Sequence, residues 1–248
     1  MVVLEGALSI KSCIHAKNAG INQRPVEKIM YTEQAAAKHP RDLAFFEKYS
    51  GRHGYTTVRC DRSEIEKLAN GATHGGFIAV CGDRALPSVT DDSIVKNGFY
   101  AYLDGIEDPY NFGQAVRSLY AAGCDGVVLP ERNWMTAAGT VCRASAGASE
   151  LIAMFTAANG FSDAFKAAGY SIVTADSGGT SIYGAKLIKP LLLIVGGEKR
   201  GISAEIAKTA DLTVTIPYGR SFSASLPACS AATVIAFEIM RQNRGRDE

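Results

Sequence analysis

The chain has 248 residues, 47% hydrophobic and 21% charged, which is enough apolar material to bury a core in one or two domains. Its net charge of +1 excludes a protein that attracts nucleic acid through a high overall positive charge, so any basic surface must be local. The N-terminus lacks the pattern of a secretion signal, and no apolar run approaches the ~20 residues that span a membrane. We therefore expect a cytoplasmic protein without a membrane partner. The six cysteines are scattered and form no C-x-x-C pair, which indicates reduced thiols and no metal site.

Residues 1–90 mix helical and extended patterns and are predicted to form a small α/β domain. A turn of four residues, 73–76, precedes the last of its strands. The expected helices are Leu8–Ala16 and 41–49, and the expected strands are Val26–Tyr31, Tyr55–Cys60 and Phe77–Cys81, with a loop at 51–54.

Ser63, followed three residues later by Glu66, predicts a capping box at the start of a helix that ends at Ala69. This part of the chain also holds most of the basic residues that we expect to be exposed. We interpret them as a solvated surface or, for some of them, as contacts to a phosphate backbone. They are Lys11, Lys17, Arg24, Lys28, Lys38, Arg41, Arg52, Arg59 and Arg62.

The composition changes between residues 85 and 98, where Pro, Ser, Thr, Asp and Gly predominate, and residues 91–98 are predicted to be a linker. Beyond it, residues 99–248 alternate strand and helix patterns, which predicts a parallel sheet covered by helices on both faces. The expected strands are Phe99–Leu103, Gly126–Leu129, Leu151–Phe155, Ser171–Ala175, Leu191–Val195 and Leu212–Ile216, and the expected helices are Phe112–Ala122, Phe161–Ala168, Ala204–Thr209 and Leu226–Asn243.

Three segments of this second domain carry chemistry. The first is N-x-G-x-x-x-R, in which Asn111 lies at a loop-to-helix junction and Arg117 lies one turn after Gly113 on the same helix face. An arginine there can hold a phosphate, although a capped helix with a surface arginine has the same pattern. The second is G-x-E-x-x-G, with Glu198 as its acid, directly after an apolar strand. It is neither a Walker loop nor G-x-G-x-x-G.

The third segment is I-P-x-G, from Ile216 to Gly219, followed by Ser225-Leu226 and a helix that begins with small residues. Ser225 fits the N-cap of that helix, and Pro227 is acceptable in its first turn. The helix is apolar nearly all round, which predicts burial in the core or in a subunit interface.

Together and in this order, the three segments resemble the motifs of the SpoU/TrmH family, the RNA ribose 2′-O-methyltransferases of the SPOUT class. The resemblance runs from Ala101 to the C-terminus. The first domain resembles, more loosely, the L30e-like RNA-binding domain that many members carry. That match uses Leu4-Glu5-Gly6 and the stretch from His74 to Val80.

The resemblance implies a C-terminal SPOUT domain with a deep trefoil knot, a rare exception to the rule that protein chains are unknotted. It implies S-adenosylmethionine as cofactor, a homodimer through the C-terminal helix, and RNA as substrate, with ribosomal RNA favoured over transfer RNA. Asn111, Arg117, Glu198 and Ser225 match the catalytic positions. The positions implied to bind the cofactor are Gly196, Gly197, Glu198, Gly201, Ile216, Pro217, Gly219, Ser225 and Leu226.

In the implied reaction a ribose 2′-hydroxyl attacks the methyl group of a sulfonium. The hydroxyl needs a base or a polarising partner, because its neutral form attacks poorly. Arg117 is the family's candidate, but arginine stays protonated in proteins. We therefore interpret Arg117 as the residue that holds the target phosphate and stabilises the developing alkoxide.

The third segment departs from the family pattern. Pro227 stands where an asparagine is usual, Cys229 stands where a second serine is common, and the loop from Pro217 to Ser225 is longer. This departure keeps open a second hypothesis, an RNA-binding paralogue of impaired catalysis. A SPOUT enzyme that methylates a base and an unrelated α/β nucleotide-binding enzyme are further alternatives.

Overall fold

The computed structural model describes residues 1–130, 137–158, 160–198 and 200–245. The chain divides into two compact units. Unit 1 comprises residues 1–85 and the described part of 133–151, and unit 2 comprises the described parts of 86–132 and 152–248. The sequence predicted a single change of domain near residue 90, whereas the chain passes between the units three times.

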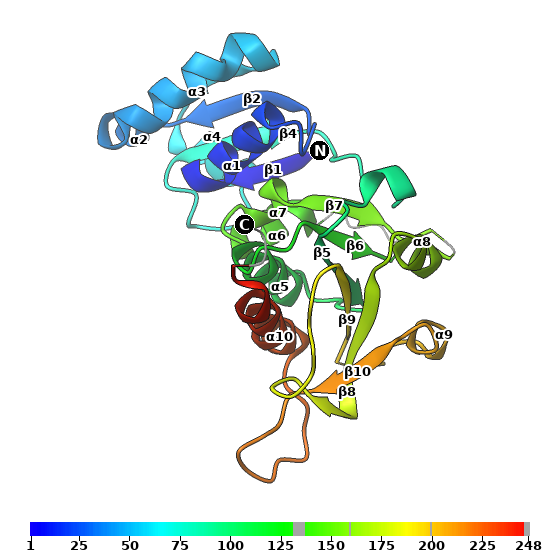
Figure 1. Cartoon of the computed structure of the whole chain (residues 1–248). Helices are drawn as coiled ribbons and strands as arrows, with labels where there is room; N and C mark the ends of the chain where they lie inside the picture. The colour runs from blue at the N-terminus through cyan, green and yellow to red at the C-terminus, as the bar shows by residue number, and fades with distance from the viewer. Residues whose placement is uncertain (131–136, 159, 199, 246–248) are drawn as a thin grey trace. The chain divides into compact units, whose positions relative to one another are not determined.

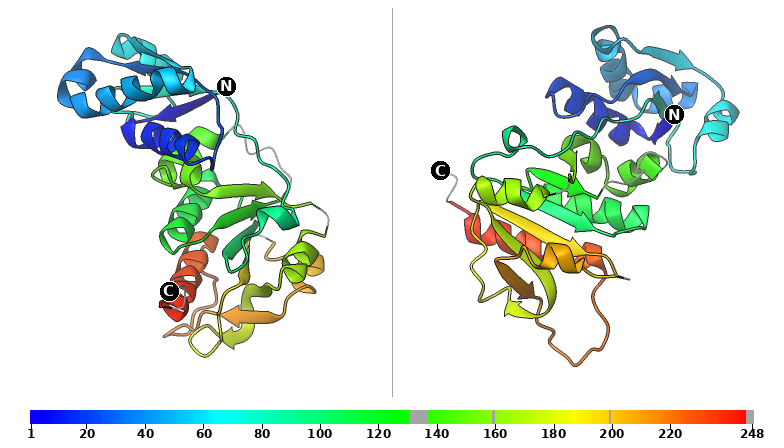
Figure 2. Two further views of the ribbon diagram at one scale, coloured as in Figure 1. Left: turned by 45° about the horizontal axis from the view of Figure 1, so that its top comes forward. Right: turned by 90° about the vertical axis from the view of Figure 1, so that its right-hand side faces the viewer.

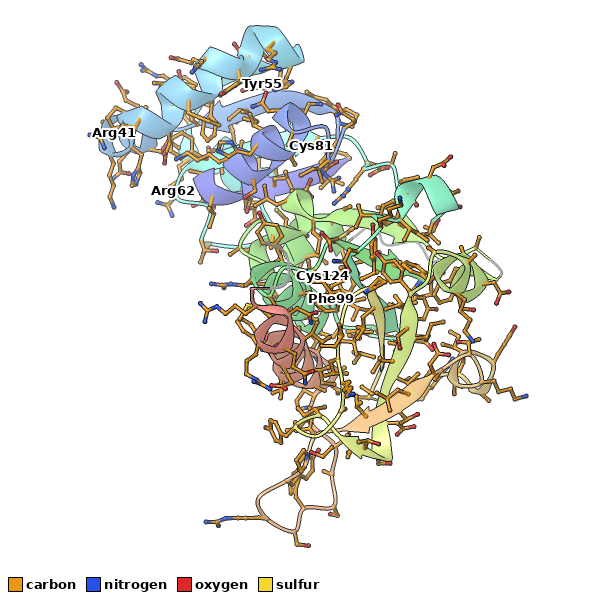
Figure 3. The ribbon with its side chains drawn as sticks, in the orientation of Figure 1. Arg41, Tyr55, Arg62, Cys81, Phe99 and Cys124 are labelled. Atoms are coloured by element: carbon orange, nitrogen blue, oxygen red, sulfur yellow. The ribbon has the colours of Figure 1, made fainter. Side chains whose placement is uncertain are left out.

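Unit 1 is built on a four-stranded sheet in the order β1-β4-β2-β3. Strand β4 is antiparallel to both of its neighbours, and β2 and β3 are parallel. Its apolar core includes Tyr55 and Cys81, while Arg41 and Arg62 are exposed (Figure 3). The elements are β1 (Val2–Glu5), α1 (Ala7–Asn18), β2 (Val26–Tyr31), α2 (Glu33–Lys38), α3 (Pro40–His53), β3 (Thr56–Arg59), α4 (Arg62–Leu68), β4 (Phe77–Cys81), α6 (Ala138–Ala144) and α7 (Ala148–Leu151).

Several local predictions for unit 1 need correction. The capping box belongs to Asp61 and Glu64, two residues before the predicted pair. Both pairs fit the sequence pattern, but only the earlier one matches the point where the chain leaves β3. The predicted loop at 51–54 is largely the last turn of α3, which ends at Gly54 in the left-handed conformation.

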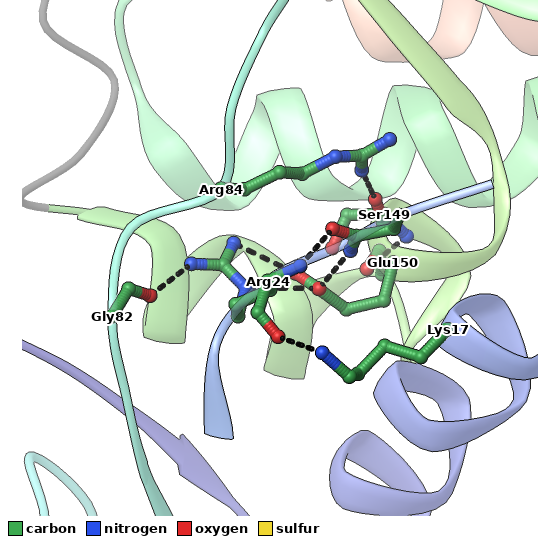
Figure 4. Close-up of polar contacts among 8 residues, drawn as sticks. Lys17, Arg24, Gly82, Arg84, Ser149 and Glu150 are labelled. Atoms are coloured by element: carbon green, nitrogen blue, oxygen red, sulfur yellow. Dashed lines mark hydrogen bonds and ion pairs between the residues drawn. The ribbon is translucent and has the colours of Figure 1, made fainter. Parts of the chain in front are cut away.

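A buried cluster of charges ties three segments of unit 1 together (Figure 4). The Arg24 guanidinium donates from Nε and Nη2 to the two carboxylate oxygens of Glu150, each at 3.0 Å, and from Nη1 to the carbonyl of Gly82 at 3.1 Å. Asn22 also donates to Glu150, and Arg84 donates to the carbonyl of Ser149. Arg24, predicted to be one of the surface basic residues, is therefore only 3% exposed.

Glu150 partly compensates the two positive charges of this cluster. Burial lowers the pKa of Arg24, but the charge and hydrogen bonds of Glu150 outweigh it, and the net pKa is raised. Burial lowers the pKa of Arg84 to about 10, even though Glu150 acts in the opposite direction. Both guanidinium groups therefore stay protonated at neutral pH, with the Glu150 carboxylate as their shared counter-charge.

Unit 2 is built on a six-stranded sheet in the order β10-β8-β9-β5-β6-β7, and all its pairings are parallel (Figure 1). The predicted parallel sheet is confirmed, and all six predicted strands are present. The elements are β5 (Phe99–Asp104), α5 (Pro109–Ala121), β6 (Gly126–Leu129), β7 (Ala153–Thr156), α8 (Phe161–Ala167), β8 (Ser171–Ser181), β9 (Leu191–Gly196), α9 (Ala204–Ala207), β10 (Leu212–Thr215) and α10 (Ala228–Asn243), with a short 3-10 turn at Asp91–Ser93.

Helices cover both faces of this sheet. Helices α5 and α10 lie on one face, and α8 and α9 lie on the other (Figures 1 and 2). Residues 191–195 of β9 are at most 2% exposed, as a strand covered on both faces requires. Phe99 and Cys124 are also buried within this unit (Figure 3). Within the described ranges, no helix combines the length and apolarity needed to cross a membrane.

The predicted linker is anchored to unit 2. The Tyr170 hydroxyl accepts a hydrogen bond from the Gly98 amide at 3.0 Å and donates to the Val95 carbonyl at 2.5 Å. The Tyr100 hydroxyl donates to the Ser93 carbonyl at 3.0 Å. A stretch that is rich in turn residues is therefore held by two buried tyrosines, a contact that its local composition does not reveal.

The last turn of α10 is fastened to the segment that leads into β9. Asn243 donates to the Leu187 carbonyl at 2.8 Å and accepts from the Lys189 amide at 3.0 Å. Gln242 donates to the Ala185 carbonyl and accepts from the Leu187 amide. Because α10 starts near the other end of β9, it runs along this strand in the opposite direction.

Replacement of Glu150 by Ala should destabilise the protein by about 3–5 kcal/mol, because it leaves two buried guanidinium groups without their counter-charge. Urea unfolding followed by circular dichroism measures the change. Glu66→Ala is the matched control, since Glu66 pairs with Arg62 in the open, with side chains 53% and 65% exposed. That control should change stability by less than about 0.5 kcal/mol. Equal losses in both variants would contradict the proposed role of the buried cluster.

Candidate functional site

A cavity of about 720 Å³ lies at the carboxyl ends of β8, β9 and β10, where ligands bind in open parallel sheets. Most residues of the second and third sequence motifs line it, although they are separated along the chain by strand β10 and helix α9. The lining includes the predicted positions Gly196, Gly197, Glu198, Gly201, Ile216, Pro217, Ser225 and Leu226.

The glycine-rich turn after β9 is shaped by backbone contacts. Asp104 of β5 pairs with Gly196 of β9, so the two strands end level with each other. A Cβ atom on Gly197 would overlap the carbonyl of Gly105, and one on Gly196 would overlap the backbone of Gly201. Gly201 itself has a φ of +64°, which glycine adopts without strain. These glycines are therefore required by the shape of the turn, independently of any ligand.

Asp104 also fixes the far side of this turn. Its carbonyl accepts the Gly197 amide, and its carboxylate accepts the Ser203 amide at 3.1 Å. The turn closes on itself through a hydrogen bond from the Gly201 amide to the Gly197 carbonyl at 2.9 Å. The segment from Gly197 to Ser203 is thus anchored at both ends to β5.

Two residues of the cavity wall, Asp176 and Ser177, were missed by the sequence interpretation. Strand β8 was predicted to end at Ala175, but it continues to Ser181. Its pairing with β10 shifts register after Thr174, because residues 175–179 bulge out of the ladder. Gly179 permits the return, since a Cβ there would lie 2.6 Å from the Thr213 carbonyl oxygen. A Gly-Gly pair inside a strand pattern is the signal that indicates such a bulge.

A second hollow of about 360 Å³ joins the first motif to the second. Asn111 and Glu198 both line it, and the Asn111 amide nitrogen lies 3.5 Å from the Glu198 carboxylate. The Cys229 thiol lies 3.8 Å from the Asn111 side-chain oxygen. The start of α5, the turn after β9 and the start of α10 are therefore neighbours.

The start of α10 differs from the prediction. The helix begins at Ala228, Pro227 occupies the N-cap position, and Ser225 lies in the preceding loop. Proline lacks the side-chain acceptor of a cap, so Ser225 is a cavity-lining residue and not the predicted cap. The loop is held by the Leu226 amide, which donates to the Tyr218 hydroxyl at 3.1 Å. Gly219, which was predicted to bind the cofactor, is exposed and does not line the cavity.

Arg117 lies away from the other predicted catalytic residues. Its side chain is exposed on α5 and lines neither of the two hollows. Helix α10 packs against α5, with Ile235 and Ile239 buried and Phe237 41% exposed. The first half of the prediction, burial in the core, therefore holds for one side of the helix only, and burial in a subunit interface stays a prediction. Tyr120 of α5 is 43% exposed. Tyr120 follows Arg117 by three residues and therefore lies on the same side of α5.

Unit 1 has a cavity of its own, of about 680 Å³. Three of the predicted phosphate-contacting residues, Lys38, Arg59 and Arg62, line it. His74 is only 2% exposed there; its Nδ1 accepts the Gly76 amide at 3.1 Å, so Nε2 carries the hydrogen. The sequence could not place the basic residues on one face, because they come from α2, β3 and α4.

Solved RNA methyltransferases share the fold of this chain. An AdoMet-bound rRNA methyltransferase from Sinorhizobium meliloti superposes with a TM-score of 0.78 at 22% identity, over 96% of this chain and 86% of that one. The SpoU methyltransferase AviRb from Streptomyces viridochromogenes, in complex with AdoMet, gives a TM-score of 0.77 at 24% identity, over 98% and 90%. The two-unit α/β architecture is therefore that of RNA methyltransferases.

The sequence identifies the family. The model of the SpoU rRNA Methylase family matches residues 98–237, and this chain belongs to that family. It is 31% identical to the 23S rRNA (guanosine-2′-O-)-methyltransferase RlmB of Photobacterium profundum, over 77% of this chain and 80% of that protein. It is 32% identical to an uncharacterized tRNA/rRNA methyltransferase of Mycolicibacterium gilvum, over 77% of this chain; the aligned part spans 63% of that protein's length.

Replacement of Gly197 by Ala should destabilise the protein by about 1–3 kcal/mol, because the new methyl group overlaps the backbone of the β5 loop. Thermal unfolding measures the effect. Gly219→Ala is the matched control: its Cβ would meet no atom within 4 Å. We expect that control to stay within about 0.5 kcal/mol of wild type. Wild-type stability of Gly197→Ala would contradict the close approach of the two loops.

Proposed function

We propose that the protein is an S-adenosylmethionine-dependent ribose 2′-O-methyltransferase that acts on ribosomal RNA. One observation carries the proposal: the second and third family motifs line a single cavity at the carboxyl ends of β8, β9 and β10. Its volume of about 720 Å³ suits a ligand the size of a nucleoside with an amino-acid tail. The AdoMet complexes of two proteins with the same fold support the choice of ligand.

The cavity residues fit such a ligand. The glycines of the turn after β9 put no side chain into the cavity, so a flat group such as adenine can approach the backbone there. Ile216 and Leu226 supply apolar walls, and Ser225 supplies a hydroxyl. When bound, S-adenosylmethionine supplies an electrophilic methyl group on a sulfonium. The residues around it would hold the cofactor in place, so that the rate depends mainly on the alignment of the reacting atoms.

Arg117 is proposed to bind the phosphate next to the target ribose and to stabilise the alkoxide that forms as the 2′-hydroxyl loses its proton. Asn111 and Glu198, 3.5 Å apart, are proposed to orient the reacting groups at the edge of the cavity. The exposed position of Arg117, outside both hollows of its own protomer, supports its use in the site of a partner subunit.

A homodimer through α10 and α5 follows from the same argument. The exposed Phe237 and Tyr120 give this face an apolar character that a second copy would cover. The deep trefoil knot of the SPOUT class is proposed for the C-terminal part of unit 2 on the resemblance of the three motifs.

Unit 1 is proposed to be the RNA-binding part. Lys38, Arg59 and Arg62, cationic groups of the kind that neutralise RNA phosphates, line its cavity together with the acidic Glu33, Asp61 and Glu64. The loose sequence resemblance to the L30e domain, around His74, agrees with this assignment. The relative named as a 23S rRNA methyltransferase favours ribosomal over transfer RNA.

The test is methyl transfer from labelled S-adenosylmethionine to purified ribosomal and transfer RNA, with digestion to nucleosides. We expect a ribose-methylated nucleoside from ribosomal RNA. A methylated base would replace the proposal with a base methyltransferase, and label only in transfer RNA would change the substrate. No transfer to any RNA, with no cofactor binding by calorimetry, would contradict the proposed activity.

Arg117→Ala should lower turnover at least about 100-fold and leave cofactor binding by calorimetry unchanged, because Arg117 contacts RNA and not the cavity. Arg244→Ala, an exposed arginine next to the last residue of α10, is the control for loss of a surface charge. Turnover of Arg117→Ala close to wild type would contradict the role of Arg117.

Mixed dimers test whether Arg117 acts across the interface. Arg117→Ala and Glu198→Ala subunits, each expected to be inactive alone, are co-expressed with different tags, and the heterodimer is purified. If Arg117 serves the partner's cavity, one of the two sites regains every residue and about half of the wild-type activity returns. An inactive heterodimer would indicate that each protomer uses its own Arg117.

The alternative, an RNA-binding paralogue of impaired catalysis, is favoured by Pro227 at the position of the usual asparagine. Pro227 lies beside the cavity at the start of α10. Calorimetry on wild type and Pro227→Asn separates the two functions: cofactor binding that appears only in the variant supports the paralogue.

A further inference from the structure

The cavity of unit 2 carries negative charge. Asp176 and Glu198 both line it, and none of the other described residues of its wall is a lysine, arginine or histidine. The remaining wall consists of backbone, apolar side chains and hydroxyl groups. The carboxylates of this wall therefore stabilise a bound cation electrostatically, relative to a neutral ligand of the same shape.

Asp176 lies at the bulge within β8, and Glu198 lies just after the end of the neighbouring strand β9. Ala175, next to Asp176, pairs with Val195 of β9, and Glu198 follows the end of the same strand. Asp176 accepts the amide of its neighbour Ser177 at 2.7 Å, and neither carboxylate forms an ion pair with another described residue. Glu198 also accepts the Asn111 side-chain amide at 3.5 Å, and neither hydrogen bond neutralises the carboxylate charge.

Methyl transfer changes the charge of the cofactor. The ribose oxygen forms a bond to the methyl carbon, the carbon–sulfur bond breaks, and its electron pair stays on sulfur. The hydroxyl proton leaves the site to solvent or to a base. The sulfonium thereby becomes a neutral thioether, and S-adenosylhomocysteine carries one positive charge less than S-adenosylmethionine.

We propose that Asp176, together with Glu198, makes this cavity discriminate by charge between cofactor and product. The carboxylates attract the sulfonium and lose that attraction once the methyl group has been transferred, which favours exit of the product. The inference rests on the proposed function and adds to it a determinant of product inhibition. Asp176 lies outside the three family motifs.

Asp176→Asn tests the inference in the full-length protein. The amide keeps the shape and can still accept the Ser177 amide, so the fold is preserved and only the charge is lost. Calorimetry measures the dissociation constants of three ligands: S-adenosylmethionine, sinefungin, in which an amine-bearing carbon replaces the sulfonium, and S-adenosylhomocysteine. Glu205→Gln is the control, because Glu205 is exposed on α9, outside the cavity wall, and its loss changes the net charge equally.

In wild type the two cations should bind more tightly than S-adenosylhomocysteine. Asp176→Asn should reduce this preference about three- to ten-fold, as expected for one partly solvated charge near the ligand, with little change for the neutral product. Added salt should also reduce the preference of the wild-type protein for the two cations over S-adenosylhomocysteine, because salt screens the carboxylate charges. Glu205→Gln should keep the wild-type ratio.

Two results would overturn the inference. One is equal weakening of all three ligands in Asp176→Asn, which would make Asp176 a general hydrogen-bonding residue. The other is an unchanged ratio of product to cofactor affinity. Absence of binding of any of the three ligands to wild type would instead overturn the proposed function, and the inference with it.

Discussion

The candidate site depends on one close approach of backbone to backbone. Strands β5 and β9 end level with each other, and the loops that follow them touch at Gly105 and Gly197, where a Cβ atom does not fit. Asp104 fixes both ends of the second loop by accepting the amides of Gly197 and Ser203. The turn is therefore held in a fixed shape by its hydrogen bonds to Asp104 and by the close packing of the two loops.

Different segments contribute different properties to the site. The glycine turn gives the cavity its shape, and the loop between β10 and α10, which extends away from the sheet in Figures 1 and 2, gives it a second wall. The two carboxylates of the cavity wall come from different places: Glu198 belongs to the glycine turn, and Asp176 lies within β8. Arg117 lies outside, on the face of α5. A substitution of Asp176 can therefore change the charge of the wall and leave the glycine turn unaltered.

Much of unit 2 could be predicted from the sequence because buried parallel strands are continuous apolar runs. Leu191–Val195 is such a run, and the glycines that follow it marked the end of the strand. The bulge of β8 was missed because the apolar strand pattern ends at Ala175, and only the pairing with β10 shows that the strand resumes at Thr180. The N-cap at Ser225 was wrong because Pro227 begins the helix without a side-chain cap. Arg24 was misjudged because its partner, Glu150, lies far along the chain.

The return of residues 137–151 to unit 1 has a consequence for how the protein is made. The first unit cannot be completed when its first 85 residues have been synthesised, because Arg24 must wait for Glu150. By then β5 and β6 of the second sheet have also been synthesised. The two units are therefore interleaved in the order of synthesis. Unit 1 is encoded in two separate stretches of the gene, with part of unit 2 between them. A single recombination event therefore cannot exchange unit 1 between relatives without also exchanging part of unit 2.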